Sequence, residues 1–284
     1  MKVLIIGATG LVGWQVFNEA ERSFSVAGTY STRPHDGLLH ADVRDAGGIL
    51  QLAKQEKPDW IIHAAALTNV DYCEDHREEA YAINVRGTEH VAIAAKAVGA
   101  GLVYLSTDYV FDGTGGPYRE EDKTSPVNYY GLTKLEGERA AARAGKYLVV
   151  RSGWIFDFSG DEKNFAFRLV QSLREGKTVH VPYDQFGNPT RARSLARAVL
   201  QLIKKDARNV FHVSGSTHLS RSAFAQRLAL HFSLDETLIV PVDTETLNQK
   251  AKRPKRAGFV VEKVEKVLGT RMESLDEMLG GIHE

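Results

Sequence analysis

The sequence predicts an α/β fold built on a doubly wound, parallel β-sheet. Short aliphatic runs alternate with amphipathic helical patterns through the first half of the 284 residues. This alternation is typical of parallel sheets that are covered by helices on both faces. A glycine-rich turn follows the first run, and two neighbouring hydroxyl side chains follow a later one. Because ligands of such sheets bind at the carboxyl ends of the strands, we expect the functional site at that edge.

The first buried strand is expected over residues 2–6 (KVLII), and it runs directly into the sequence GATGLVG. Helical spacing of apolar residues then begins at Trp14. Glycines at these positions let the backbone turn tightly and approach a pyrophosphate, while the N-terminus of the following helix attracts negative charge. A merely structural turn is the alternative, which the position between first strand and first helix disfavours. The candidate cofactor-binding residues of this turn are Gly7, Thr9, Gly10, Leu11, Val12 and Gly13.

The end of the second strand, expected over residues 25–30, indicates which dinucleotide is used. Enzymes that select NAD usually have an acidic residue about 20 positions past the glycines, which binds the ribose 2′-hydroxyl. Here Ser31, Thr32 and Arg33 follow the strand, and Asp36 is the nearest acid. Hydroxyls and a guanidinium suit a 2′-phosphate, so NADPH is the expected cofactor and NADH the alternative. A solvated loop is the other interpretation of the arginine.

Three later segments are expected to border the same nucleotide. Asp42 could reach an adenine edge, and its alternative role is that of a turn or capping acid for a helix that starts near Asp45. A buried strand at residues 60–63 precedes three alanines, whose small side chains let a ligand lie close to the backbone. A long helix is expected over residues 78–99, with polar Asn84 inside its apolar pattern. The further candidate cofactor contacts are Asp42, Val43, Ala64, Ala65, Ala66 and Asn84.

A tyrosine and a lysine four residues apart indicate proton chemistry. A helix is expected to begin at Asn128, which places Tyr130 and Lys134 on one face. The pKa of an isolated phenol is about 10, and a nearby positive charge lowers it, so that the tyrosine becomes a usable acid or base. A hydroxyl at Ser106 or Thr107, at the end of the preceding strand, could orient the reacting oxygen. A solvated helix face is the alternative for such a pair, so supporting context must come from the rest of the chain.

Composition excludes several classes of partner. Lysine plus arginine and aspartate plus glutamate both number 36, and the pI near 7.2 gives no field that would favour nucleic acid or an acidic membrane. Cys73 is the sole cysteine, which rules out an intrachain disulfide and fits a reducing compartment. No signal-peptide layout opens the chain, so a cytoplasmic location is expected. His63 has no metal-ligand type of residue nearby, so we expect a packed or hydrogen-bonded histidine and no metal site.

The last third of the chain is less regular and is expected to supply the substrate side. Residues 1–153 are predicted to form a Rossmann-type nucleotide-binding domain, and residues 154–284 mainly a smaller α/β substrate-binding region. A helix over residues 191–205 is expected to pack back on the first domain. The basic run at residues 250–256 carries five cations in seven residues. It is either a solvated loop or a diphosphate-binding segment.

Together these features resemble the extended short-chain dehydrogenases/reductases over essentially the whole chain. Within that superfamily, the sequences STDYVFDG (residues 106–113), PYRE (117–120) and DQFGNPT (184–190) resemble the dTDP-4-dehydrorhamnose reductase family. The regulatory NADP-binding subunit of methionine adenosyltransferase shares these motifs. The superfamily features that carry the resemblance are the glycine turn, Asn84, Ser106, Thr107, Tyr130 and Lys134.

The resemblance implies NADPH-dependent reduction of a nucleotide-linked 4-keto-6-deoxysugar, in this family dTDP-4-dehydrorhamnose to dTDP-L-rhamnose. Tyr130 would protonate the developing alkoxide, Lys134 would lower the tyrosine pKa and hold the nicotinamide ribose, and Thr107 would bind the substrate carbonyl oxygen. The implied partner is the nucleotide sugar, and a homodimer is the candidate assembly. The implied substrate-binding residues are Thr68, Thr107, Asp108, Val110, Trp154 and Arg253.

Two departures from the resemblance bear on the reaction and the substrate. The 4,6-dehydratases of the superfamily place an Asp-Glu pair after the threonine, whereas this chain has Asp108-Tyr109, so dehydratase chemistry is not expected. After Arg253-Pro254 the family continues with an Asn-Ser-x-Leu-Asp-like sequence, and this chain reads RAGFV instead, which leaves the sugar and the nucleotide open. A regulatory subunit without turnover, another ketoreductase and an epimerase remain alternatives. An epimerase requires tightly held NAD, which the missing acid after the second strand disfavours.

Overall fold

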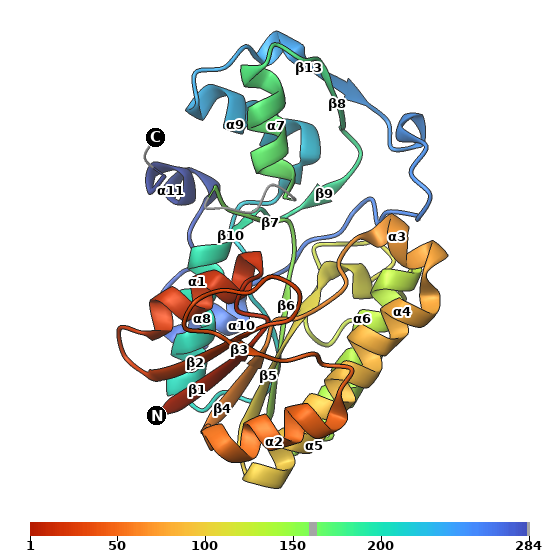
Figure 1. The fold of residues 1–284 in the computed structure, drawn as a ribbon. Coiled ribbons are helices and arrows are strands. Elements are labelled where there is room, and N and C mark those ends of the chain that lie inside the picture. The colour runs from red at the N-terminus through yellow and green to blue at the C-terminus, as the bar shows by residue number, and fades with distance from the viewer. Residues whose placement is uncertain (159–163, 283–284) are drawn as a thin grey trace.

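The computed structural model describes residues 1–158 and 164–282, which form two lobes (Figure 1). Within these residues, the larger lobe contains a seven-stranded parallel sheet in the order β3-β2-β1-β4-β5-β6-β11. The strand order reverses between β1 and β4, where parallel sheets bind ligands. The predicted doubly wound α/β fold is therefore confirmed. The strands are β1 (Lys2–Ile6), β2 (Ser25–Tyr30), β3 (Leu39–His40), β4 (Trp60–His63), β5 (Gly101–Thr107), β6 (Tyr147–Ser152) and β11 (Asn209–His212).

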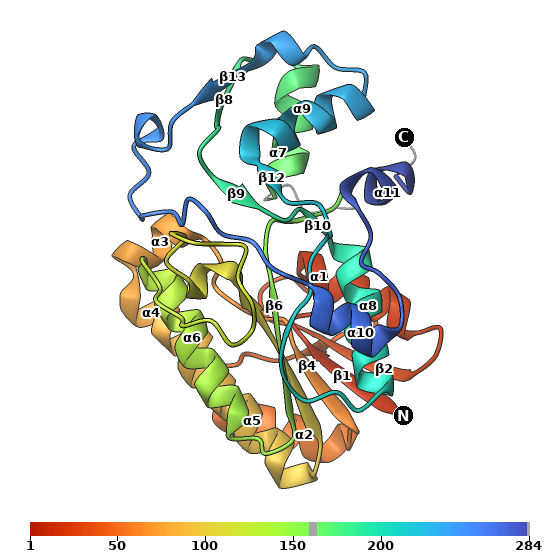
Figure 2. The same cartoon turned by 180° about the vertical axis from the view of Figure 1, so that it is seen from behind.

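Helices cover both faces of this sheet (Figures 1 and 2), which explains why its central strands are mostly apolar on both sides. In β1, Val3 and Ile5 belong to one core cluster, and Leu4 and Ile6 belong to the cluster on the opposite face. The first cluster lies under α1 (Leu11–Ala20), α8 (Ala192–Lys204) and α10 (Glu262–Leu268). The second lies under α2 (Ala46–Glu56), α5 (Gly87–Val98) and α6 (Tyr129–Ala142).

Polar side chains begin the helices where the sequence placed them. The Asn128 side chain accepts a hydrogen bond from the Gly131 N–H at 2.7 Å and caps α6. Asp45 caps α2 in the same way. Ser220 caps α9 (Arg221–His231), and Asn164 caps α7 (Phe165–Arg174). The helix starts expected at Asn128 and near Asp45 are confirmed, because a side-chain oxygen before an apolar pattern satisfies the first backbone donors of a helix.

The long helix expected over residues 78–99 is confirmed as a continuous helical segment over residues 77–98, but it contains a π turn. Its parts are α4 (Arg77–Tyr81), a π-helical turn over Ala82–Arg86, and α5, and the short helix α3 (Val70–Asp75) precedes them. The Asn84 amide in this turn accepts a hydrogen bond from the Leu67 N–H at 2.8 Å and donates to the Leu67 carbonyl at 3.1 Å. Apolar spacing does not reveal a π turn, which often marks a functional position.

The smaller lobe is built from α7, α9, α11 (Leu275–Gly280) and three short strand pairs. Its core contains Phe156, Leu169, Phe224, Leu228 and Met278, which are all almost fully buried. The strand pairs are β7 (Ile155–Phe156) with β10 (Thr190–Arg191), β9 (Phe186–Gly187) with β12 (Leu219–Ser220), and β8 (Val179–Pro182) with β13 (Ile239–Val242).

The chain returns to the larger lobe after building part of the smaller one. Leu195 and Val199 of α8 lie in the same core cluster as β1, as the sequence suggested for this helix. Strand β11 extends the sheet next to β6, and α10 packs beside α8. Because both parts of the chain contribute to the sheet and its cover, the boundary at residue 153 stays a prediction. None of the helices in the described ranges has the length and apolar character that a bilayer-spanning helix needs.

The basic run at residues 250–256 connects the two lobes. Lys250 pairs with Asp75, and Arg253 pairs with Asp71 of α3 at 2.7 Å. Lys255 pairs with Asp184 at 2.9 Å and with Glu245 at 2.6 Å, both from the smaller lobe. Three of the five cations are therefore engaged by carboxylates on different elements, which neither of the two sequence interpretations anticipated.

Packing of α8 on the sheet predicts a stability effect. Leu195→Ala should lower the free energy of unfolding by about 2–5 kcal/mol, because it opens a cavity at a fully buried position. Leu230→Ala on α9, where the leucine is 71% exposed, should change it by less than about 0.5 kcal/mol. Urea unfolding of both variants measures the difference. Equal effects would contradict the assignment of α8 to the core.

Candidate active site

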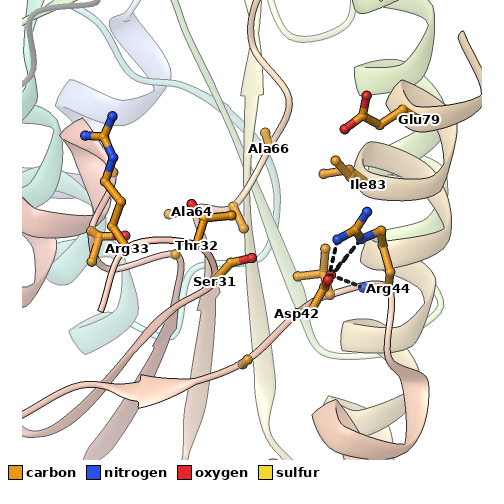
Figure 3. Close-up of a pocket in the computed structure, with 15 residues that line it drawn as sticks. Ser31, Thr32, Arg33, Asp42, Arg44, Ala64, Ala66, Glu79 and Ile83 are labelled. Atoms are coloured by element: carbon orange, nitrogen blue, oxygen red, sulfur yellow. Dashed lines mark hydrogen bonds and ion pairs between the residues drawn. The ribbon is translucent and has the colours of Figure 1, made fainter. Parts of the chain in front are cut away.

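The glycine turn and three strand ends border a cavity of about 390 Å³ (Figure 3). Gly7 has φ +88°, and a Cβ there would lie 2.7 Å from the Ala65 nitrogen. A Cβ at Gly13 would lie 2.1 Å from the Gly7 carbonyl oxygen, so both positions require glycine. The cavity is lined by eleven of the predicted cofactor residues, namely Gly7, Thr9, Gly10, Ser31, Thr32, Arg33, Asp42, Val43, Ala64, Ala65 and Ala66.

The lining also includes Ala41, Arg44, Glu79 and Ile83, which the sequence reasoning missed. The Arg44 guanidinium donates to both carboxylate oxygens of Asp42, with distances of 2.6 and 3.0 Å. Hydrogen bonds from Arg44 hold the pKa of the Asp42 carboxyl below its usual value. In Figure 3 this pair lies across the cavity from Arg33. The spacing of two residues between the acid and the arginine was the signal that could have revealed the pair.

Besides Tyr130 and Lys134, four predicted cofactor residues lie outside this lining. Leu11, Val12 and Gly13 form the first turn of α1, directly after the glycine turn. Asn84 is 1% exposed and donates to the Thr133 hydroxyl of α6 at 3.0 Å, in addition to its two bonds with Leu67. Both amide hydrogens are thus used within the protein. The described contacts of Asn84 fasten the loop after β4 to α6, and a direct cofactor contact stays a prediction.

The three residues expected to be catalytic lie together at the end of β5. Tyr130 and Lys134 are one helical turn apart in α6, and their side chains are nearly buried. The Thr107 hydroxyl lies close enough to the Tyr130 phenol to act on its pKa. The same hydroxyl donates to an Asp108 carboxylate oxygen at 3.1 Å. The neighbouring Ser106 hydroxyl instead donates to a buried glutamate in α6. Of the two candidate hydroxyls, Thr107 is therefore the one beside the tyrosine.

Burial dominates the proton affinities of the tyrosine–lysine pair. It raises the pKa of Tyr130 above the ordinary phenol value, although the Thr107 hydrogen bond acts in the opposite direction. Burial lowers the pKa of Lys134 to about 7, against an upward contribution from Glu138. The net shift of the Tyr130 pKa is thus opposite to the lowering expected from the sequence. The reason is that removal from water penalises the charged form of both side chains.

A buried ion pair adjoins Lys134 and was not foreseen. Glu138, one helical turn beyond the lysine, accepts hydrogen bonds from the Arg151 guanidinium at 2.8 and 2.9 Å. The Ser106 hydroxyl donates to the same carboxylate at 2.5 Å. All three side chains are nearly buried. The i, i+4 spacing from Lys134 to Glu138 was the available sequence signal.

Two predicted substrate residues follow Thr107 directly. Asp108 is 2% exposed, and its Oδ2 has no hydrogen-bond partner in the part of the chain that the structure describes. Burial raises the pKa of the Asp108 carboxyl to about 6. The Val110 side chain is fully buried in a cluster with Phe111 and Tyr118. The substrate roles of both residues stay predictions.

The other predicted substrate residues lie on three different segments. Thr68 is exposed in the loop that follows the three cavity alanines. Trp154 has a left-handed backbone conformation, φ +48°, directly after β6. Arg253 donates both ends of its guanidinium to Asp71. His63, by contrast, is buried and hydrogen-bonded to a threonine hydroxyl at 3.1 Å, as the sequence indicated.

The sheet order, the glycine turn beside a cavity, and a tyrosine–lysine pair beside a strand-end threonine define an oxidoreductase of the extended short-chain dehydrogenase/reductase class. A family described as the RmlD substrate binding domain matches residues 1–282. The chain belongs to this family. The predicted membership in the dTDP-4-dehydrorhamnose reductase family is thereby confirmed.

Relatives and solved structures agree with this membership. The dTDP-4-dehydrorhamnose reductase of Salmonella typhimurium is 38% identical over 77% of this chain and 72% of its own length. A structure of dTDP-4-dehydrorhamnose reductase from Bacillus anthracis in complex with NADP has a TM-score of 0.89, at 31% identity over 98% of this chain and 97% of that chain. Methionine adenosyltransferase 2 subunit beta of Xenopus tropicalis is 32% identical over 94% of this chain and 82% of the relative.

The shifted pKa of Lys134 predicts that stability rises with pH. Between the folded pKa of about 7 and the unfolded value near 10, the unfolded chain binds the extra proton, so raising the pH favours the folded state. Urea unfolding should show a gain of up to about 2 kcal/mol from pH 7 to pH 9 from this group. Lys134→Met should remove that gain, whereas Lys96→Met, at an exposed lysine, should keep it. Equal pH dependence in both variants would contradict the burial of a titrating lysine.

Arg33 should discriminate between the two dinucleotides. Arg33→Ala removes a charged donor for the 2′-phosphate, so the KM for NADPH should rise about tenfold or more while the KM for NADH changes little. Arg22→Ala, at an exposed arginine that pairs with Glu19, is the matched control. Initial rates with each cofactor measure the effect. A similar rise for both cofactors would show that Arg33 does not bind the 2′-phosphate.

Proposed function

We propose that this chain catalyses the NADPH-dependent reduction of a nucleotide-linked 4-keto-6-deoxysugar, and specifically of dTDP-4-dehydrorhamnose to dTDP-L-rhamnose. The observation that carries the proposal is the convergence of Thr107, Tyr130 and Lys134 at the end of β5. This strand neighbours β4, whose end supplies the alanines of the glycine-turn cavity. The names of the relatives supply the substrate class.

The residues of the cavity fit NADPH. The glycine turn leads directly into the N-terminus of α1, whose backbone N–H groups can bind a pyrophosphate. Hydroxyls at Ser31 and Thr32 and the guanidinium of Arg33 offer donors for a 2′-phosphate. When bound, the reduced nicotinamide supplies a hydride to C4 of the sugar. The Lys134 ammonium is the proposed partner of the nicotinamide ribose.

The raised pKa of Tyr130 suits the direction of reduction. At neutral pH the phenol stays protonated, so it carries the proton that the C4 oxygen must receive as the carbonyl becomes an alcohol. The Thr107 hydroxyl orients the oxygen between itself and the phenol. Once the proton has left, the phenolate favours protonated Lys134 one helical turn away, because opposite charges stabilise each other strongly in a buried site. Lys134 thus stabilises the Tyr130 phenolate after proton transfer, although it does not ionise the phenol beforehand.

A regulatory NADP-binding subunit is the second candidate, and the similarity to methionine adenosyltransferase 2 subunit beta favours it. The intact Thr107, Tyr130 and Lys134 favour turnover, because a purely regulatory protein does not need an acid at this place. A cytoplasmic location and a homodimer complete the proposal. Cys73, the sole cysteine of the sequence, is buried.

The proposal is tested by following NADPH absorbance when the protein meets dTDP-4-dehydrorhamnose. Tyr130→Phe should lower kcat by about 10²- to 10⁴-fold, because the proton donor is removed while the ring that packs against Tyr109 remains. Tyr129→Phe, at the adjacent helix position, is the control and should keep the activity. NADPH binding without oxidation of any 4-keto-6-deoxy nucleotide sugar would contradict a reductase and favour the regulatory candidate.

A further inference from the structure

Arg221 is a cation beside the candidate active site that the proposed mechanism does not use. It is the first residue of α9, directly after the capping residue Ser220. Its N–H donates to the Gln185 carbonyl at 2.8 Å, and the preceding strand β12 pairs with β9. The smaller lobe therefore fixes the backbone from which the side chain extends.

Two aromatic rings hold the Arg221 side chain. The central carbon of its guanidinium lies 3.7 Å from the centroid of the Trp154 ring and 4.8 Å from that of Phe165. The indole is itself fixed, because a Cβ at Gly187 would lie only 2.6 Å from it. Stacking uses the flat faces of a guanidinium and leaves its N–H groups, which point outward in the plane, available for an acceptor.

No protein acceptor takes those N–H groups in residues 1–158 and 164–282. The described contacts of the Arg221 guanidinium are the two aromatic rings, and no hydrogen bond or ion pair to an oxygen accompanies them. On the same helix, Arg227 pairs with Asp276 at 2.7 Å. A partly buried charge that lacks an acceptor is costly, and an anionic ligand would offset that cost.

The electrostatic surroundings of Arg221 also favour an anion. Asp108 and Tyr109, next to catalytic Thr107, raise its pKa, whereas Arg253 and Arg168 lower it. Burial is the largest cause, and it brings the pKa of the guanidinium to about 10, so the group stays charged at neutral pH. Three arginines from different elements are thus within electrostatic reach of one another. These like charges repel one another, and an anion bound between them would offset that repulsion.

We propose that Arg221 binds the diphosphate of the nucleotide-linked sugar, with Arg253 and Arg168 adding positive charge around it. This inference rests on the proposed function, since it assigns a residue to that substrate. In a nucleotide-linked 4-ketosugar, one pyranose ring separates the diphosphate on C1 from the reacting C4. Arg221 stacks on Trp154, and the neighbouring Gly153 packs against the Asp108 carboxyl, so Arg221 lies near the segment that follows Thr107. Two N–H groups of a guanidinium also fit two phosphate oxygens.

Titration calorimetry with dTDP, in the presence of saturating NADP⁺, tests the inference. Arg221→Gln should weaken dTDP binding by about 10- to 100-fold, because a charged hydrogen-bond donor is lost. The dTDP affinity of Arg221→Lys should lie between those of the wild type and Arg221→Gln, since lysine keeps the charge but not the planar pair of donors. Arg227→Gln is the matched control on the same helix and should bind as the wild type does. Inorganic pyrophosphate as a second probe should follow the same order.

The outcomes separate this inference from the proposed reaction. Unchanged dTDP affinity in Arg221→Gln, or an equal loss in Arg227→Gln, would overturn the diphosphate role. Thermal unfolding identifies a variant that fails to fold, in which case Arg221→Lys decides. If dTDP binds to the wild type and binds more weakly to Arg221→Gln, but the wild type does not oxidise NADPH, the diphosphate role is supported and the reductase activity is contradicted. If the protein oxidises NADPH and its KM for the sugar nucleotide is the same in Arg221→Gln, the reductase activity is supported and the diphosphate role of Arg221 is refuted.

Discussion

The buried pair of Glu138 and Arg151 fixes the helix that carries Tyr130 and Lys134. It joins α6 to β6, and the hydroxyl of Ser106 extends the contact to β5. Burying two charges is costly, and the cost is offset here by parallel N–H donors and by the added hydroxyl. Tyr130 and Lys134 lie on the turns of α6 just before this joint. Their position above the end of β5 therefore depends on a polar contact inside the protein rather than on apolar packing alone.

Burial on both faces explains why much of the fold was predictable. The run at residues 60–63 is apolar because helices cover the sheet on each side, and such runs stand out in a sequence. Capping residues such as Asn128 and Asp45 have short-range effects, so they also marked helix starts correctly. The π-helical turn at residues 82–86 was missed, because long-range hydrogen bonds of Asn84 accompany it. The strand pairs β7–β10 and β9–β12 were also missed, because strands of two residues are too short to show a periodic hydrophobic pattern.

The residues of the site were predictable where backbone geometry or helical spacing dictates the residue type. The pKa shifts of these residues were not predictable, because they depend on burial. The glycine turn and the Tyr130–Lys134 spacing could be read directly. The sign of the Tyr130 pKa shift could not, because it depends on how completely the surrounding elements exclude water. Arg221 carries no local signal, since an arginine at the start of a helix is ordinary. Its significance depends on its contact with Trp154, which lies far away in the sequence.

The chain returns to the sheet more than once, and this limits how its substrate specificity can change in evolution. The path leaves the sheet after β6, comes back in α8 and β11, leaves again at β12, and comes back a second time in α10. A contact such as that between Trp154 and Arg221 joins two separate excursions. No single cut would therefore release the smaller lobe as a unit that could be exchanged. A change of sugar or nucleotide would have to arise by substitutions spread over several excursions, while the sheet that connects them stays intact.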